Sequence, residues 1–277
     1  MSSNSSKILD VSFLYCYGYK FGKKVTQNSL SKVKNGDKIL ACKIIKNKLE
    51  NKKLNECMEA LKPILHPYIV TIHSIVQNGK FSFIFMQWYD GFTLLEYLQQ
   101  HGMADEVTAK LWFFQSLSAI EYLHKLGFAY CNLKCDCVML ERNNVKISGL
   151  RHMRKWEEGR KVEIKARKSI LPFYNPPEVN LGRACDPRKV DIFTLGTILF
   201  MMLNGMPPFN NSNISQLVDD QINQRFQFRA SNIRTLSVEC QVMVYTLLEP
   251  NHDFRWNVEK IIQMKWLSKY GHKQGDS

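Results

Sequence analysis

The sequence predicts an α+β protein in which a small, sheet-rich lobe is followed by a larger, mostly helical lobe. Over residues 1–90, short apolar runs such as KILACKII and FSFIFMQW have the pattern of strands, and only residues 54–65 have the periodicity of a helix. After Asp90 and Gly91 the pattern becomes helical, as in AKLWFFQSLSAIEYLHKLG and VDIFTLGTILFMMLNG. With 277 residues, 45% of them hydrophobic, the chain is long enough to bury a substantial core.

Hydrophobicity and cysteine usage indicate a reducing, aqueous environment. The opening MSSNSSK is polar, and the longest apolar stretch, residues 192–203, is too short to span a bilayer. Eight cysteines occur without the dense spacing of a small secreted domain. We therefore expect reduced thiols, a cytoplasmic location and no membrane span.

The charge is strongly and locally positive. The formal net charge is +13, with eleven lysines between Lys20 and Lys53 and eight Lys or Arg residues against three Glu in residues 151–168. Such an excess attracts acidic proteins, nucleic acid or anionic membranes, and for the lysine-rich segment a merely solvated face is the alternative. Because no module of interleaved aromatic and basic residues is visible, we expect an acidic protein partner and no nucleic acid.

Several motifs follow one another in the order found in protein kinases. LACK, residues 40–43, resembles the VAIK strand, whose lysine pairs with nucleotide phosphates. LHKLGFAYCNLKCDCVML resembles the HRDLKxxN region, and PFYNPPEV resembles the segment that ends in APE. The resemblance covers nearly the whole chain and implies the two-lobed protein kinase fold, with an antiparallel sheet and one helix in the small lobe. The implied bounds are a tail at 1–14, the small lobe at 15–87, a hinge at 88–91, the large lobe at 92–270 and a tail at 271–277.

The resemblance also assigns three residues to structural roles. DIFTLGTILFMMLNGMPPF is similar to the buried helix that begins with Asp and anchors the large lobe of kinases, which places Asp191 beneath the catalytic loop. LLEPNHDFRW resembles the turn whose arginine pairs with the APE glutamate, which pairs Arg255 with Glu178. The opening GYKFGKKVTQNSLSKVK and the final KIIQMKWL are similar to the calcium/calmodulin-dependent kinase group, most of all to testis-specific serine kinases.

At the positions that perform phosphoryl transfer the sequence departs from the family. The glycine-rich loop corresponds to residues 26–33, where side chains at all three glycine positions would obstruct the approach of backbone N–H groups to phosphate. Asn132 stands at the HRD aspartate, and an amide is not a base. Cys137 and Gly149 stand at the two magnesium ligands, although Mg²⁺ needs oxygen ligands. Cys131 replaces the arginine that commonly binds a phosphorylated activation loop.

The nucleotide pocket is the part of the family site that we expect to persist as a vestige. Its expected members are Lys43, Val33, Ala41, Trp88 and Met139. The helix glutamate that pairs with this lysine falls on Cys57, and a shift of one residue would give Glu56 instead. We expect no cofactor, and any ATP should bind weakly and without a metal. The clustered cysteines at 131, 135 and 137 lack a second pair at zinc-finger spacing, so we expect no metal site.

Together these features predict a catalytically inactive kinase domain, a pseudokinase. Its expected role is that of a scaffold or allosteric regulator in protein phosphorylation signalling, and an active kinase is one candidate for its partner. The basic segment 151–168 is the expected docking surface for an acidic partner. The alternative is a divergent serine/threonine protein kinase with residual ATP-dependent phosphotransfer, which would need a new base and a new metal site.

Overall fold

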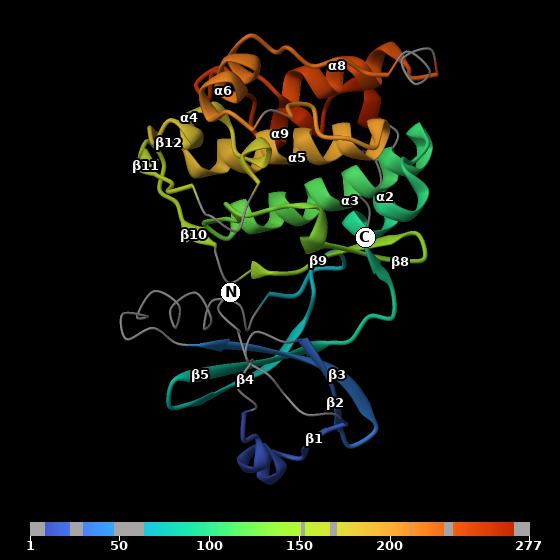
Figure 1. The fold of residues 1–277 in the computed structure, drawn as a ribbon, viewed down its shortest axis with the longest axis vertical. Helices are drawn as coiled ribbons and strands as arrows, with labels where there is room; N and C mark the ends of the chain where they lie inside the picture. Colours follow the sequence, from blue (N-terminus) through green and yellow to red (C-terminus); the bar gives the residue numbers. More distant parts are fainter. Residues whose placement is uncertain are drawn as a thin grey trace. The chain divides into compact units, whose positions relative to one another are not determined.

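A computed structural model of the chain confirms the predicted fold class. It describes residues 9–22, 30–46, 64–150, 153–166, 171–210, 212–229 and 235–268. The chain divides into two compact units, residues 1–90 and 91–277, which we call the small lobe and the large lobe. Figure 1 shows strands dominating the first and helices dominating the second. The finer domain bounds given above stay predictions.

The small lobe contains a five-stranded antiparallel sheet in the order β1-β2-β3-β5-β4. Its strands are β1 (Tyr19–Phe21), β2 (Leu30–Asn35), β3 (Lys38–Lys46), β4 (Ile72–Asn78) and β5 (Phe81–Gln87), and a short 3₁₀ helix, η1 (Ser12–Tyr17), precedes them. The expected strands KILACKII and FSFIFMQW are confirmed as β3 and β5. Alternate side chains of β3, Leu40, Cys42 and Ile44, pack with Phe83 and Phe85 of β5 in one apolar core. Residues 54–63 of the predicted helix, with Cys57 and Glu56, lie outside the described residues.

The large lobe is organised around two long helices that the sequence predicted. The helices described are α2 (Leu94–His101), α3 (Glu106–Lys125), α4 (Pro177–Asn180), α5 (Pro187–Asn204), α6 (Ile214–Ile222), α8 (Val238–Leu247) and α9 (Val258–Ile261). Helix α3 is capped at its start by Asp105, whose carboxylate accepts hydrogen bonds from two backbone N–H groups of the first turn. Helix α5 is buried on all sides from residue 190 to residue 204, which explains why its sequence is almost entirely apolar.

Short strands of the large lobe place the catalytic-loop region. A three-stranded sheet contains β6 (Phe92–Thr93), β8 (Val138–Glu141) and β9 (Asn144–Ile147), and two further pairs join β7 (Phe128–Ala129) to β10 (Arg154–Lys155) and β11 (Val162–Glu163) to β12 (Ala184–Cys185). Residues 130–137 run from β7 to β8 and end in the 3₁₀ helix η2 (Cys135–Cys137). Within the described parts of the chain, no helix combines the length and the apolar character that crossing a bilayer requires.

Candidate active site

Asp191, near the start of α5, holds the backbone of the catalytic loop. Its carboxylate accepts hydrogen bonds from the backbone N–H groups of Tyr130 and Cys131, both at 2.7 Å, and lies 2.9 Å from Nε2 of His124. Cys131 has a left-handed backbone with φ of 55°, a conformation that few residues other than glycine adopt. The hydrogen bond to its N–H helps to hold that conformation, so the structural role predicted for Asp191 is confirmed.

A second buried anchor joins α4 to the turn after α8. Arg255 donates two hydrogen bonds to the carboxylate of Glu178, Nη1 at 2.8 Å and Nη2 at 3.2 Å, and both side chains are buried. The same guanidinium donates to the backbone carbonyls of Glu249, Lys189 and Pro250. A buried charge is tolerated when it is paired and fully hydrogen-bonded, as this one is. The predicted pairing of Arg255 with Glu178 is confirmed.

Asn132, at the position of the family's catalytic aspartate, is buried on the loop between β7 and β8. Among the residues that the structure describes, its amide oxygen Oδ1 has no hydrogen-bond partner. That oxygen can accept a hydrogen bond but does not take up a proton at neutral pH, so the side chain cannot act as a base.

The same loop contains a carboxylate, that of Asp136, which the kinase motifs did not single out. It is 41% exposed at its side chain and forms an ion pair with Lys134 at 2.5 Å. A signal was present in the sequence, because Asp136 is the only acidic residue from Leu126 to Leu140. The loop therefore has a carboxylate four residues after Asn132, next to a cation.

The two positions expected for magnesium ligands lie together and leave no room for a carboxylate. Gly149 has φ of 79°, and a Cβ added to it would lie 2.9 Å from the hydroxyl oxygen of Tyr130 and 3.4 Å from the sulfur of Cys137. The Tyr130 hydroxyl donates to the backbone carbonyl of Ser148. Ser148 in turn donates to the backbone carbonyl of Cys137, from its N–H at 2.8 Å and from its hydroxyl at 3.2 Å. Burial raises the pKa of the Cys137 thiol, so it stays neutral.

These residues do not fit Mg²⁺, because a hard cation takes oxygen ligands and they offer a neutral thiol and a bare backbone. More widely, the described ranges contain no group of three His, Cys, Asp or Glu side chains that could hold a metal ion.

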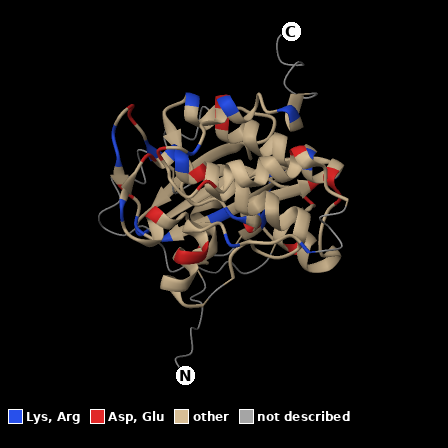
Figure 2. Cartoon of the chain, turned by 90° about the horizontal axis from the view of Figure 1, so that it is seen from above, with Lys and Arg blue, Asp and Glu red and all other residues tan. Residues whose placement is uncertain are grey.

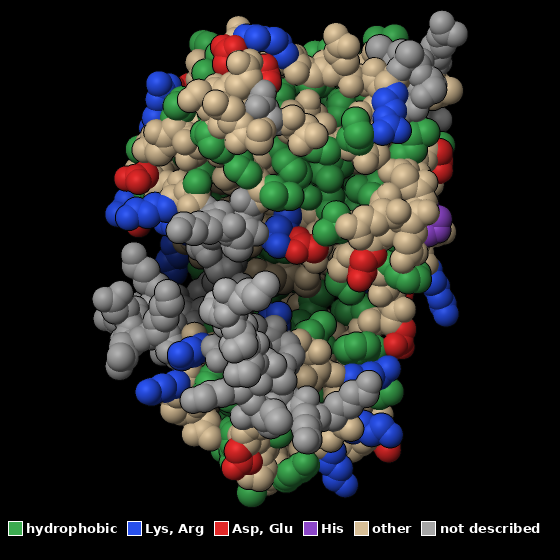
Figure 3. Space-filling model, in the orientation of Figure 1, with side chains coloured by type: hydrophobic (Ala, Val, Ile, Leu, Met, Phe, Trp, Pro, Cys, Tyr) green, Lys and Arg blue, Asp and Glu red, His purple; other side chains and the backbone are tan. Residues whose placement is uncertain are grey.

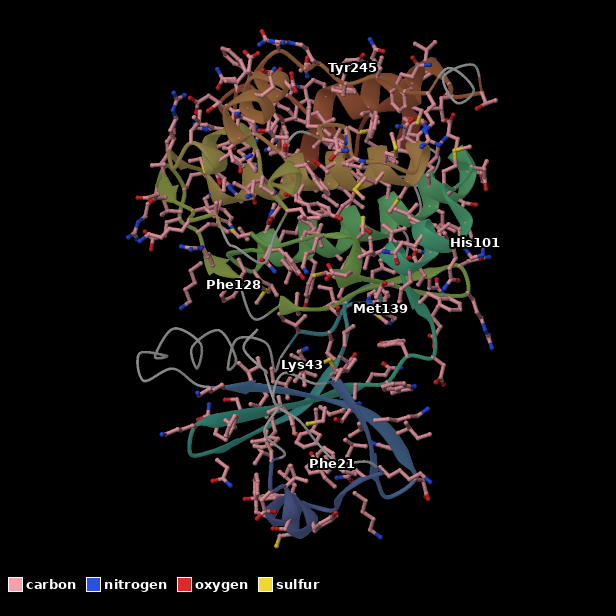
Figure 4. The ribbon with its side chains drawn as sticks, viewed as in Figure 1. Phe21, Lys43, His101, Phe128, Met139 and Tyr245 are labelled. Carbon is pink, nitrogen blue, oxygen red and sulfur yellow. The ribbon has the colours of Figure 1, made fainter. Side chains whose placement is uncertain are left out.

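The residues expected around the nucleotide are divided between the two lobes. In the small lobe, Lys43 is half-buried on β3 opposite Ile84 of β5, and Ala41 and Val33 are buried in the same sheet. Met139 is half-buried on β8 of the large lobe; Figure 4 labels it and Lys43. Each lobe is described by itself, so a pocket shared between them stays a prediction.

Trp88, the remaining member, is held by its neighbours in the small lobe. Its indole N–H donates to the Asp90 carboxylate at 2.6 Å, and the ammonium of Lys32 lies 4.7 Å from the centre of its ring. The hydrogen bond from the indole, with help from Lys32, lowers the pKa of Asp90. Residues 26–29 of the expected glycine-rich loop lie outside the described residues.

Comparison with known proteins places the chain in a family. The sequence profile of the protein kinase domain matches residues 22–267, so the chain belongs to the protein kinase family. It is 29% identical over 273 residues to human testis-specific serine/threonine-protein kinase 1, an alignment that covers 93% of this chain and 74% of the relative. The mouse protein of the same name is 29% identical over 274 residues, with the same coverage, and mouse testis-specific serine/threonine-protein kinase 2 is 28% identical over 273 residues, covering 93% of this chain and 75% of its own. The resemblance to testis-specific kinases is thereby confirmed.

The same comparison corrects one expectation. We predicted that the chain is not an enzyme, and this is wrong: the relatives are named serine/threonine-protein kinases, which points to an enzyme. The prediction counted substitutions at the family's own positions, 132, 137 and 149. It gave no weight to other polar groups of the same loop, of which the carboxylate of Asp136 is the clearest example.

Proposed function

We propose that this kinase-family chain acts in protein phosphorylation signalling as a scaffold or allosteric regulator, with an active serine/threonine kinase as its partner. One contrast supports the proposal. Two structural anchors of the large lobe are present: Asp191 holds the catalytic loop by hydrogen bonds, and Glu178 pairs with Arg255. The positions 137 and 149, by contrast, carry groups that do not suit a metal. The proposed role depends on what the chain binds, and the rate at which the chain itself transfers phosphate is a separate quantity to be measured.

The basic segment, residues 151–168, supports an acidic partner, but fewer of its cations are available to that partner than its composition suggested. Arg160 forms an ion pair with Glu157 at 3.0 Å, and Lys161 forms one with Asp253 at 2.8 Å, so two of its cations are neutralised within the chain. Lys165 is exposed and forms no ion pair with any residue that the structure describes. Figure 2 shows Lys and Arg intermingled with Asp and Glu on the cartoon of the chain. Residues 151, 152, 167 and 168 lie outside the described residues.

A second candidate is a divergent serine/threonine kinase that transfers phosphate itself. The names of the relatives favour it, and so does the exposed carboxylate of Asp136 beside Lys134. In this case Asp136 would accept the proton of a substrate hydroxyl.

Capture of the tagged chain from native tissue separates the two candidates. The captured material is incubated with labelled ATP and a generic basic substrate, and the wild-type chain is compared with the Lys43→Met and Asp136→Asn variants. If the chain regulates a partner kinase, a part of the captured kinase activity should be the same with all three chains, because that part belongs to the partner. Activity that disappears with either variant would establish the second candidate, and capture of no kinase at all would contradict the regulatory role.

Two further parts of the proposal concern the nucleotide and the compartment. We propose that ATP binds weakly and without a metal, because positions 137 and 149 supply no oxygen ligand for Mg²⁺. We also propose a cytoplasmic location. The seven cysteines in the described residues form no disulfide, which suits a reducing compartment.

A further inference from the structure

Of the site residues described above, only Glu178 and Pro250 line a hollow on the surface of the large lobe. It has a volume of about 320 Å³ and lies where α4, the end of α6 and the turn after α8 meet. We call it the α4–α6 hollow. Its lining residues are Pro177, Glu178, Leu181, Arg183, Ile222, Pro250, Asn251 and His252.

Half of the lining residues are apolar, and two of these are exposed to solvent. Leu181 is 43% exposed and Ile222 is 48% exposed, and the rings of Pro177 and Pro250 complete the apolar wall. Figure 3 shows hydrophobic side chains gathered on the face of the large lobe turned toward the viewer. Large aliphatic side chains that line a concave surface in this way are typical of a binding site for an apolar group.

An ion pair and backbone hydrogen bonds hold the residues at the base of the hollow. The ion pair with Arg255 neutralises the carboxylate of Glu178. The backbone carbonyl of Glu178 accepts a hydrogen bond from the N–H of Arg183 at 2.8 Å. The N–H of Leu181 donates to the carbonyl of Pro177 at 2.9 Å. The backbone that presents Leu181 is therefore hydrogen-bonded within the lobe itself, which limits the ordering that binding would require of this part of the wall.

One border of the hollow is cationic. Arg183 is exposed and forms no ion pair with any residue in the described ranges. It precedes β12, where Ala184 pairs with Glu163 of β11, so Arg183 lies beside the residues that lead to Lys165. Lys161, before β11, is bound to Asp253, the neighbour of the lining residue His252. The basic segment therefore lies next to the lining residues, and Arg183 is the cation at this border that no described carboxylate neutralises.

We propose that the α4–α6 hollow binds a segment of the partner protein that presents one large aliphatic or aromatic side chain flanked by Asp or Glu. The inference rests on the proposed regulatory function and names the surface and the partner chemistry for it. The apolar wall of Leu181 and Ile222 would cover the anchor side chain, and Arg183 would pair with a flanking carboxylate. A second copy of this chain is a poor occupant, because a net charge of +13 makes two copies repel one another.

Selection from a random peptide library tests the proposal with the full chain as bait. The enriched peptides are labelled, and their affinities are measured by fluorescence polarisation for the wild type and for the Ile222→Ser and Arg183→Gln variants. Ile39→Ser, at an isoleucine that is 45% exposed in the small lobe, and Lys34→Gln, at another exposed cation, are the matched controls.

The enriched sequences should combine an apolar anchor with acidic neighbours. Ile222→Ser should weaken their binding by roughly tenfold or more, as expected when a buried aliphatic contact is lost. Arg183→Gln should weaken binding and flatten its dependence on salt, while both controls bind as the wild type does. All four positions are exposed, so each variant should keep the melting temperature of the wild type.

Several results would overturn the proposal. The first is that the enriched peptides are neutral or basic. The second is that the wild type enriches no peptides beyond those that the Ile222→Ser/Arg183→Gln double variant enriches. The third is that the peptides bind the wild type and both single variants with equal affinity. Self-association by light scattering that Ile222→Ser abolishes would assign the hollow to a second copy instead. If the wild type and Ile222→Ser capture the same kinase from tissue equally well, the docking role of the hollow is refuted and the regulatory function stands. If the wild type captures no kinase, the regulatory function fails, whatever the peptides show.

Discussion

Replacing Arg255 by Met should destabilise the large lobe severely. The substitution removes both hydrogen bonds to Glu178 and the three that Arg255 donates to backbone carbonyls, and it leaves the Glu178 carboxylate buried without a counter-charge. Removing one partner of a buried ion pair costs about 3–5 kcal/mol. For a unit of this size about 2–4 °C of melting temperature corresponds to each kcal/mol, so we expect a decrease of roughly 6–20 °C.

Differential scanning calorimetry measures this directly, with an exposed ion pair as the control. Lys161→Met breaks the pair with Asp253, whose two side chains are 49% and 60% exposed, and should cost less than about 1 kcal/mol. A double variant, Glu178→Leu with Arg255→Met, leaves no buried charge and should recover part of the loss. If Arg255→Met melts within about 2 °C of Lys161→Met, the pair does not anchor the lobe.

Three further predictions concern the candidate active site. Gly149→Asp should lower the free energy of unfolding in urea by about 1–3 kcal/mol, because it places a side chain at φ of 79° and against the hydroxyl of Tyr130; unchanged stability would refute the crowding. ATP with EDTA and ATP with Mg²⁺ should give the same small thermal shift, and a shift seen only with Mg²⁺ would contradict metal-independent binding. Burial raises the pKa of Cys135 to about 12, so in a Cys57→Ser chain at about pH 7 to 9 its protonated thiol should react with iodoacetamide far more slowly than the exposed Cys16; equal rates would show that the loop opens readily.

Much of the fold was predictable because it depends on local patterns and on motifs in a fixed order. Helix α5 combines a start at Pro187 with a long apolar run, and its buried Asp191 stands out against that run. The pairing of Glu178 with Arg255 spans 77 positions, and only the resemblance to kinases could predict it. Strands β3 and β5 are nine and seven residues long, and their apolar runs were sufficient to identify them.

The rest depends on contacts between distant segments, which no local pattern specifies. Lys161 looked like a free docking cation, but its partner Asp253 lies 92 positions away. The crowding at Gly149 comes from the ring of Tyr130, which reaches a backbone carbonyl 18 positions further on. The α4–α6 hollow unites three segments that are separate in the sequence, and for that reason the sequence around Ile222 does not predict it.

The most direct test of the regulatory function is the rate of the serine/threonine kinase that is captured with this chain. That kinase is purified and assayed while the wild-type chain or the Lys43→Met variant is titrated into it. Both chains should change its kcat/KM by the same factor and saturate, because the effect comes from binding. No change with either chain, or a change that Lys43→Met abolishes, would contradict the proposed function.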